Sequence, residues 1–505
     1  MKFSSIVLPV CATLSSSVLA WDEEPVPDYV AVPSAECDAC RQTIDDLEMK
    51  WTNETEVEEI LSDLKRQCLT QDSLPKKKFC DAAVEVLVQL PPGIFEGIES
   101  LAWPVSLGLC ATSGSCQVNC CPAGAPPEQI HLSLSSSDRS LMGVSWVTLE
   151  GTDSVVRYGT SETDLEYAEQ GTELTYTQAG WVGVIHRAVM TGLKPATTYY
   201  YQVGSVKENR WSDVHSFTTF TPGKELNFAI VADMAYDSLS DNTVASMTRL
   251  VDEGKLDVVI HSGDISYADG YMPHFDDFLN KVQPIATRIP YMTTPGNHEF
   301  GYNFSAYKSR FFMPGQLLGD GASDGMYYSW NYGEIHFAAM NSESPIDTAM
   351  FPEEEYNWFD KDLKNHADAR WKVAHFHRPL YCAKDVDCGK RLVDAGVEQL
   401  LYQNQVDIAF VAHEHTYERT YPMYQGQLTA TGVYSPVYMM QGASGNREGN
   451  KGDYPPLSEL PSWVASVHND IGYGILTQAA DGQSLSWNFY NSETETALDT
   501  VTYMK

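Results

Sequence analysis

The sequence predicts a multidomain protein with an α-helical first module, an all-β sandwich and an α/β domain, and three observations support this organisation. Cysteines separated by amphipathic segments occupy the N-terminal part. Short alternating apolar runs separated by turn residues fill residues 127–221, as in a β-sandwich. From residue 222 onward, apolar runs alternate with helical patterns such as Val244, Met247, Leu250 and Val251, as an α/β fold requires.

Residues 1–20 have the features of a signal peptide. A basic residue precedes an apolar stretch, and Val18 and Ala20 suit a cleavage site. No later segment has the ~18 uninterrupted apolar residues of a membrane-spanning helix. Of the 11 cysteines, one lies in this peptide, and the even remainder fits an oxidising route, as do glycosylation sequons at Asn53 and Asn303. We therefore expect a secreted, lysosomal or vacuolar protein.

The charge balance is strongly acidic and limits the classes of partner. The chain has 68 acidic and 33 basic residues, a formal net charge of −35. This balance argues against a nucleic-acid partner, because sequence-independent binding to nucleic acid needs a basic surface. It also repels anionic substrates at long range, so any site for them needs local positive charge.

Six cysteines define the module predicted at residues 21–117. Their spacing leaves all pairings open. A zinc site at the C-x-x-C of 37–40 is an alternative, but no second such pair or paired histidines accompany it. With its amphipathic segments and its L-G-L-C at 107–110, the pattern resembles a saposin B-type domain. That resemblance implies a helical fold, an apolar face that opens onto lipid or a membrane surface, and the nested disulfides Cys37–Cys116, Cys40–Cys110 and Cys68–Cys80. The alternative is a folding module without lipid contact.

Residues 118–126 form a Pro/Gly-containing linker with two adjacent cysteines, Cys120 and Cys121. These two either bond to each other or bridge elsewhere, and the sequence does not decide between the two arrangements. Cys382 and Cys388 are close enough in sequence for a local disulfide, which would fix the loop between them.

Five apolar runs in residues 222–505 end in side chains that bind metals. Each run is short and rich in β-branched or aromatic residues, so each is predicted to be a buried strand. Open α/β sheets bind ligands beyond the carboxyl ends of their strands. The side chains that follow the runs are Asp233, Asp264, Tyr267, Asn297, His298, His377, His413 and His415.

The types of these residues predict an asymmetric pair of metal ions. One carboxylate can bridge two cations at the ~3.5–4 Å separation of two-metal hydrolases. A phenolate favours trivalent iron, whereas imidazole and amide groups suit a divalent ion. Taken singly, each run has an ordinary explanation as a helix cap, a turn or a chance pair of histidines. All five in order favour the metal site.

In this order the blocks resemble the motifs of the purple acid phosphatases, over about residues 127–500. The blocks are D-M-A at 233–235, G-D-I-S-Y at 263–267, G-N-H-E at 296–299, H-R-P-L-Y at 377–381 and A-H-E-H-T-Y-E-R at 412–419. The resemblance implies a fibronectin type III-like domain at 127–221, where G-L-K-P-A-T-T-Y-Y-Y-Q-V-G lies. It also implies a calcineurin-like metallophosphatase domain at 222–505, an α/β sandwich of two sheets.

The resemblance also assigns the ligands and a catalytic residue. Asp233, Tyr267 and His415 would bind Fe(III), and Asp264 would bridge the two ions. Asn297, His377 and His413 would hold a divalent metal, either zinc, manganese or ferrous iron, which all accept such ligands. His298 would face the substrate and either stabilise the transition state or protonate the leaving group.

The chain departs from the family pattern in three ways. Ala235 and Ala412 replace usual glycines, and the added methyl groups would shift their loops slightly. His375 lies two residues before His377 on the same strand face, and we expect it to pack behind the ligands. Between Arg378 and His413 the chain lacks the histidines that other members place over the substrate.

The sequence thus predicts an acid phosphatase that hydrolyses phosphate monoesters, with a hydroxide on the Fe(III)–M(II) pair as nucleophile. An alternative is a lipid phosphoesterase resembling acid sphingomyelinase, which has a saposin module but a zinc pair without a phenolate. A third hypothesis is a saposin-type lipid-binding protein with a vestigial metal site. Tyr267 argues against the second, and the complete ligand set argues against the third.

Overall fold

The structure is a computed structural model that divides into two compact units. It describes residues 37, 41, 116–121, 126–135, 137–151, 153–316, 324–343, 352–385, 387–430, 432–450 and 452–505. The predicted signal peptide, the sequon at Asn53 and most of the predicted saposin-like module, with the pairs Cys40–Cys110 and Cys68–Cys80, lie outside the described residues.

The described part of the smaller unit contains two disulfides. Cys37 bonds to Cys116 across 79 residues of sequence, which is the outermost pair of the nested pattern. Cys120 bonds to its neighbour Cys121. The adjacent cysteines, for which the sequence left two arrangements open, therefore pair with each other.

A short parallel strand pair follows these cysteines in the same unit. β1 (Val118–Asn119) pairs with β7 (Trp181–Val182). The amide of Cys120 donates to the Val182 carbonyl at 2.9 Å, and the indole of Trp181 stacks on Tyr176 with ring centroids 4.5 Å apart. Residues of the predicted linker thus take part in a two-stranded sheet.

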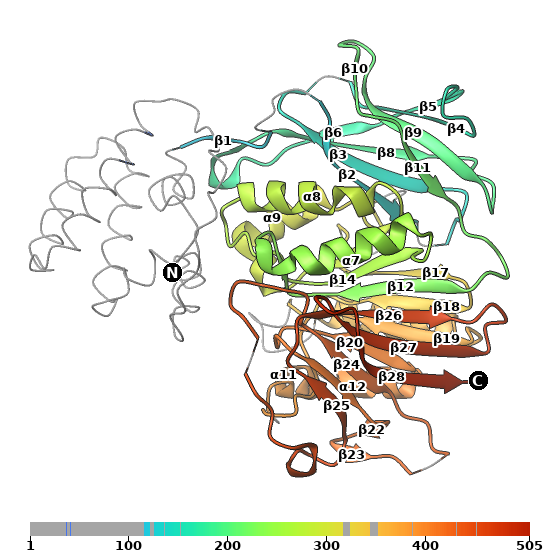
Figure 1. The fold of residues 1–505 in the computed structure, drawn as a ribbon, viewed down its shortest axis with the longest axis vertical. Helices are drawn as coiled ribbons and strands as arrows, with labels where there is room; N and C mark the ends of the chain where they lie inside the picture. The colour runs from blue at the N-terminus through green and yellow to red at the C-terminus, as the bar shows by residue number, and fades with distance from the viewer. Residues whose placement is uncertain are drawn as a thin grey trace, which may run out of the picture. The chain divides into compact units, whose positions relative to one another are not determined.

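The first part of the larger unit is a β-sandwich, as its alternating sequence predicts (Figure 1). Its inner faces bury an apolar core that includes Trp146, Tyr201 and Phe217. One sheet has the order β2 (Glu128–Leu134), β3 (Met142–Thr148), β8 (Val184–Met190) and β6 (Thr172–Leu174). The other has the order β10 (Arg210–Trp211), β9 (Thr198–Ser205), β4 (Val155–Gly159) and β5 (Tyr167–Gln170), with β11 (His215–Thr218) also paired to β9.

Two mixed sheets form the rest of the larger unit. The six-stranded sheet has the order β16 (Tyr291–Thr294), β14 (Val258–Ser262), β12 (Leu226–Val231), β26 (Gly472–Gln478), β27 (Ser484–Asn491) and β28 (Ala497–Met504). The seven-stranded sheet has the order β17 (Tyr328–Tyr332), β18 (Ile335–Ala339), β19 (Trp371–His375), β20 (Ile408–Val411), β24 (Val437–Gln441), β21 (Tyr417–Thr420) and β25 (Val464–His468). In each sheet the central strands that precede the predicted ligands are parallel.

Aromatic side chains pack the two sheets face to face. Phe228 of β12 lies 5.0 Å, centroid to centroid, from Phe337 of β18, and Phe410 of β20 lies at the same distance from Trp487 of β27. The same part of the chain also contains two two-stranded sheets. One pairs β13 (Met234–Ala235) with β15 (Ile265–Ser266), and the other pairs β22 (Met423–Tyr424) with β23 (Gln427–Leu428). This two-sheet arrangement is the fold class expected for residues 222–505.

Helices flank these sheets within the described residues (Figure 1). They are α7 (Asp241–Asp252), α8 (Pro273–Ala286), α9 (Gly301–Arg310), α10 (Glu353–Asn365), α11 (Lys390–Asp394) and α12 (Val397–Gln403). The pattern of Val244 and Met247 correctly predicted α7, which buries both side chains. Among the described helices, none is both long and apolar enough to cross a membrane.

All five apolar runs that were predicted to be strands are strands. They are β12, β14, β16, β19 and β20, and the predicted metal-binding residues follow their carboxyl ends. The parallel strands bring these ends to one edge of each sheet. The connections at this edge are therefore where a site can be built.

Candidate metal centre

The predicted ligands lie in tight loops with unusual backbone geometry. Asp233, Asp264, Tyr267 and His413 have φ values of 51°, 51°, 56° and 74°. This left-handed region is uncommon for residues with a Cβ and costs free energy. Such strain is typical of functional sites, where the surrounding structure holds the side chains in position.

Gly263 permits the close approach of two of these loops. Its φ is +86°, and a Cβ at this position would lie 2.7 Å from Nδ1 of His377. That distance is shorter than any real contact of a Cβ atom, so a side chain here would displace the imidazole. The G-D-I-S-Y block therefore needs glycine at this position for two reasons, the positive φ and the nearby imidazole of His377.

The first group of ligands surrounds the phenol of Tyr267. Its hydroxyl oxygen lies 2.9 Å from Nε2 of His415 and 3.2 Å from Oδ1 of Asp233. Nε2 of His415 is also 3.4 Å from Oδ1 of Asp233. Burial, together with the nearby Asp233 carboxylate, raises the pKa of Tyr267 well above its usual value. Only a strong cation in this position would therefore replace the phenolic proton.

The second group surrounds the carboxylate of Asp264. Its Oδ2 lies 3.1 Å from Nε2 of His377, which in turn lies 3.1 Å from Oδ1 of Asn297. Its Oδ1 accepts the backbone N–H of His298 at 3.0 Å. Burial raises the pKa of Asp264, but the charges of His377 and His298 offset this effect and hold the pKa well below its usual value. Asp264 is therefore an anion at the centre of the site.

His413 completes this second group. Asp264, His377 and His413 each offer a ligand atom within 4.8 Å of the others. Burial and the positive charge of Arg378 hold the pKa of His413 well below its usual value. His413 is therefore neutral, as a metal ligand must be.

His377 has the opposite electrostatic environment. Burial lowers the pKa of His377, but the Asp264 carboxylate raises it to about 9. Its Nδ1 lies 3.1 Å from the carbonyl of Ser262, which orients the ring and leaves Nε2 toward Asp264. A metal ion at Nε2 would have to displace a proton, as it does when it binds any imidazolium.

Glu299 of the G-N-H-E block supports the loops without facing the ligands directly. Its carboxylate accepts the N–H groups of Gly296, Asp264 and Ile265 at 2.7, 2.9 and 2.9 Å. Burial and the neighbouring Asp264 raise the pKa of Glu299 to about 8. The side chain therefore ties the loop after β16 to the loop after β14.

Two residues beside the site were not identified from the sequence. Nη1 of Arg378 lies 3.0 Å from Nε2 of His413, and its Nε is 3.0 Å from the buried Glu343 carboxylate. Arg378 directly follows a predicted ligand, which is a signal that could have identified it. Glu448 lies in the loop after β24, a strand of the seven-stranded sheet that runs parallel to β20. Its Oε1 lies 3.6 Å from Nε2 of His298.

Two of the three departures from the family pattern concern residues with definite positions. Ala235 and Ala412 are fully buried, and their amides donate to the carbonyls of Gly445 and His377 at 2.8 and 2.7 Å. His375 is fully buried, and among the described residues neither of its ring nitrogens has a hydrogen-bond partner. Burial lowers its pKa to about 3. His375 thus packs in the core as a neutral ring.

A disulfide lies in the loop that follows β19 and His377. Cys382 bonds to Cys388, six residues later. The amide of Ala383, which directly follows Cys382, donates to the carboxylate of Glu418 at 2.7 Å. This loop is therefore closed covalently and attached to β21.

The side chains present fit a pair of metal ions. Two carboxylates, a phenol, an amide and three imidazoles converge, and pairs of neighbouring donor atoms lie 2.9–3.4 Å apart. Ligands at ~2.0–2.2 Å from one ion have separations of about this size. Hard oxygen donors gather on the Tyr267 side and nitrogen and amide donors on the His377 side, so the two positions differ chemically.

The fold and this site define a metallophosphoesterase, and comparisons with known families agree. Residues 212–417 match the calcineurin-like phosphoesterases. Residues 127–219 match the purple acid phosphatase N-terminal domain, and residues 435–500 match the C-terminal region of iron/zinc purple acid phosphatase-like proteins. Together these matches cover most of the described part of the chain.

Individual relatives extend the match. Acid phosphatase type 7 of Danio rerio is 33% identical over 399 residues, which cover 70% of this chain and 85% of that protein. Purple acid phosphatase 15 of Arabidopsis thaliana is 31% identical over 64% of this chain and 69% of its own. The structure of purple acid phosphatase PPD1 from yellow lupin (Lupinus luteus) has the same fold, with a TM-score of 0.65 and 23% identity over 75% of this chain and 74% of its own. The chain belongs to the purple acid phosphatase family and is a hydrolase of phosphoric esters.

Proposed function

We propose that the chain hydrolyses phosphate monoesters at a binuclear Fe(III)–M(II) centre, where M is zinc, manganese or ferrous iron. The phenol of Tyr267 beside Asp233 and His415 carries this proposal, because a phenolate, a carboxylate and an imidazole together suit iron(III). Asp264 would bridge the ions, and Asn297, His377 and His413 would hold the divalent metal. When bound, such a pair supplies Lewis acidity to the phosphoryl group and activates water.

The remaining groups of the site act on the substrate and its charge. His298 has a nearly buried side chain, and its Nε2 is 3.8 Å from Oδ2 of Asp264, so it borders the same space as the ligands. It would hold a proton for the leaving oxygen or stabilise transition-state charge. Arg378 is positioned by Glu343 and supplies the positive charge that an anionic ester needs in a chain of net charge −35.

A His298→Ala variant tests this assignment. We expect turnover of a soluble phosphomonoester to fall by about 10²–10⁴-fold, the usual contribution of one acid–base group. Metal content should stay at the wild-type level, because His298 is not among the proposed ligands. An equal loss of iron would make His298 structural, and unchanged turnover would remove it from the reaction.

We also propose the following domain boundaries. They comprise a signal peptide at 1–20, a saposin B-type domain at 21–117, a linker at 118–126, a fibronectin type III-like domain at 127–221 and the catalytic domain at 222–505. The proposed route is secretion or delivery to a lysosome or vacuole, with glycans at Asn53 and Asn303. Asn303 has an exposed side chain in α9, which a glycan requires.

We also propose that the N-terminal module contacts a lipid surface. This proposal depends on the spacing of the six cysteines. Two of them, Cys37 and Cys116, form a disulfide in the described part of the chain. Flotation of the full chain with anionic vesicles at pH 4.5 and pH 7.5 tests it, since acidic side chains lose charge at the lower pH. Binding at pH 4.5 would support it, and no binding at either pH would leave a folding module.

A lipid phosphoester is the alternative substrate. Turnover of sphingomyelin in vesicles, compared with turnover of a soluble monoester, separates the two. We expect faster turnover of the monoester. A clear preference for sphingomyelin would replace the proposed substrate class.

A further inference from the structure

A second group of metal-binding side chains lies on β18 and α10 and shares no residue with the site described above. It consists of His336, Asp362 and His366, each of which offers a ligand atom within 4.8 Å of the others. Nε2 of His336 lies 2.9 Å from Oδ2 of Asp362. Nδ1 of His366 lies 3.4 Å from Oδ1 of the same carboxylate.

Neighbouring side chains hold the cluster from outside. Oδ1 of Asn331 lies 2.9 Å from Nδ1 of His336, and the hydroxyl of Ser329 donates to Oδ1 of Asp362 at 2.9 Å. When Nδ1 of His336 donates its proton to Asn331, Nε2 is left without one and faces a carboxylate oxygen. Two acceptors at 2.9 Å repel unless a cation lies between them. Metal-binding histidines commonly have this arrangement, with the second ring nitrogen donating to an oxygen.

The distances suit a transition-metal ion. Zinc binds imidazole nitrogen and carboxylate oxygen at ~2.0–2.2 Å, so neighbouring donors around one ion are separated by about 3.0–3.5 Å. The separation of 3.4 Å lies in this range and that of 2.9 Å lies just below it, each to a different oxygen of Asp362. Two nitrogen donors and one oxygen donor favour zinc over calcium or magnesium, which prefer oxygen ligands alone.

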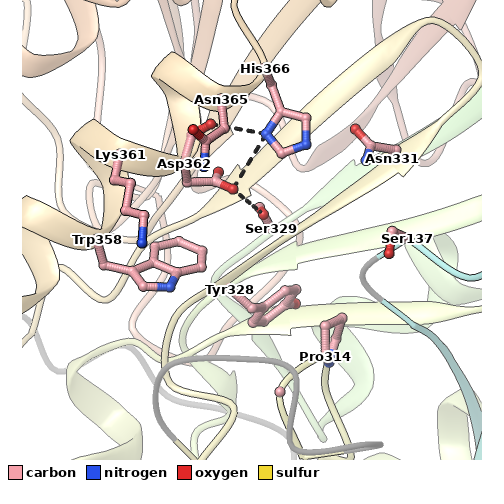
Figure 2. A pocket seen from close by; sticks show the side chains of 11 residues that line it. Ser137, Pro314, Tyr328, Ser329, Asn331, Trp358, Lys361, Asp362, Asn365 and His366 are labelled. Atoms are coloured by element: carbon pink, nitrogen blue, oxygen red, sulfur yellow. Dashed lines mark hydrogen bonds and ion pairs between the residues drawn. The ribbon is translucent and has the colours of Figure 1, made fainter.

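A cavity adjoins the cluster and gives it access to solvent. Its volume is about 300 Å³, and Asp362, His366, Ser329 and Asn331 are among its lining residues. Figure 2 shows Asp362 and His366 pointing toward each other at one side of this cavity, with Trp358 and Lys361 nearby. A water molecule in this space can supply the fourth ligand that zinc needs.

One movement of a side chain is needed for a shared ion. The rings of His336 and His366 are stacked with centroids 3.8 Å apart, so their in-plane lone pairs do not meet at one point. The His336 side chain is fully buried and held by Asn331, whereas the His366 side chain is 34% exposed. His366 follows the last residue of α10, and turning its ring toward the ion would break the hydrogen bond between its Nδ1 and the backbone carbonyl of Asp362, now 2.9 Å long.

We propose that His336, Asp362 and His366 bind one zinc ion, with the His366 ring turned toward it and water from the cavity as fourth ligand. The ion would join α10 to β18 through side chains that the phosphatase site does not use. The alternative is a hydrogen-bonded network in which Nε2 of His336 donates to Asp362. The two arrangements differ in whether the folded protein binds an additional zinc ion.

Metal analysis of the full chain after dialysis against Zn²⁺ tests this proposal. The His366→Ala variant should contain one zinc ion fewer per chain than the wild type. The Asn365→Ala variant, which changes another cavity residue without removing a ligand, should keep the wild-type zinc content. Equal zinc content in His366→Ala and wild type would overturn the proposal and leave a hydrogen-bonded network.

Two further measurements guard against a folding defect. Asp362→Asn keeps the shape of the side chain and should lose the same zinc ion, with a wild-type circular dichroism spectrum. Asn331→Ala removes only the contact to His336 and should weaken zinc binding by about 10–100-fold. Zinc affinity unchanged in both folded variants would contradict the site. Iron measured in the same samples reports the loading of the phosphatase centre, so a loss of zinc at unchanged iron content belongs to this cluster, whether or not the enzyme is active.

Discussion

Tyr267 and its neighbours show how burial and nearby charges set the protonation of individual residues before a metal binds. Desolvation and nearby carboxylates raise the pKa of the phenol, whereas neighbouring imidazoles lower the pKa of Asp264. His413 is neutral, and His377 holds a proton up to a pH of about 9. Metal binding to this set must release protons, so affinity should fall as the pH falls.

Arg378 provides a test of substrate binding that is separate from metal binding. Replacement by Ala removes the guanidinium beside His413, and we expect kcat/KM for a phosphomonoester to fall about 10–100-fold through lost charge-assisted contacts. Arg378→Lys keeps the charge without the bidentate geometry, so its kcat/KM should fall less than that of Arg378→Ala. Steady-state kinetics with parallel metal analysis measures both. Wild-type kcat/KM in Arg378→Ala would remove the residue from substrate binding.

His186 predicts a pH dependence of stability within the sandwich. It is buried between the hydroxyls of Thr148 and Ser154, each 2.7 Å from a ring nitrogen, and burial lowers its pKa to about 4. The unfolded state, with an ordinary pKa near ~6.5, takes up a proton first. The stabilisation is therefore complete above pH ~6.5 and is lost as the pH falls toward about 4.

Replacement of His186 by Gln should make stability less sensitive to acid. Between pH 7.5 and pH 4.5 the wild type should lose about 2–3 kcal/mol more unfolding free energy than the variant. Urea unfolding at the two pH values measures this difference. The same loss in both proteins would show that His186 is not the group responsible.

At the scale of secondary-structure elements, loops after parallel strands do most of the positioning. The Gly263→Ala substitution tests this, because its Cβ would lie 2.7 Å from the ring of His377. We expect loss of the divalent metal and at least about 10-fold lower activity, since a shift of a ligand disturbs the coordination geometry. Gly254→Ala is a matched control, with a φ of +65° and no atom within 4 Å of the added Cβ.

The Gly254→Ala control should lose about 1–2 kcal/mol of unfolding free energy from its left-handed backbone alone. It should keep its metals. Metal analysis and thermal melting of both variants separate the steric effect from the backbone effect. Equal metal content in Gly263→Ala and Gly254→Ala would contradict the close approach of the two loops.

The elements also show what the sequence could and could not predict. The strands β12, β14, β16, β19 and β20 carry a local signal, since each is a short apolar run with a polar residue at its carboxyl end. The two-residue strands β13 and β15 have no such signal and form only because their loops meet. Glu448 was missed because β24 ends in a glycine-rich loop, and its carboxylate approaches His298 only through the pairing of distant strands.

The cluster of His336, Asp362 and His366 is a similar case. His336 lies in a strand and the other two lie at the end of a helix 26 or more residues later. No motif connects them, and single histidines in amphipathic segments usually have other roles. Tertiary packing of α10 on β18 is what places them together.

Over the larger unit, a buried ion pair between α8 and α9 is hydrogen-bonded to β2 of the sandwich. Nη1 of Arg310, at the end of α9, lies 2.8 Å from Oδ1 of Asp276 in α8 and 2.8 Å from Oε1 of Gln129 in β2. The side chains of Arg310 and Asp276 are fully buried. Removal of one partner leaves an uncompensated charge in the interior.

We therefore expect Arg310→Ala to lose about 3–5 kcal/mol of unfolding free energy. Arg249→Ala, which breaks the exposed pairs with Glu253 and Glu495, serves as a control and should lose less than about 1 kcal/mol. Chemical denaturation at neutral pH measures both. Similar losses in the two variants would show that the buried pair does not stabilise the contact of the two helices with β2.

The phenol–iron bond is the claim on which the account of the whole molecule depends, and absorption spectroscopy with iron analysis tests it most directly. The wild-type protein should contain iron and show a visible charge-transfer band, and folded Tyr267→Phe should lack that band. A colourless, iron-free wild-type protein that still hydrolyses phosphomonoesters, or an unchanged band in Tyr267→Phe, would contradict the assignment.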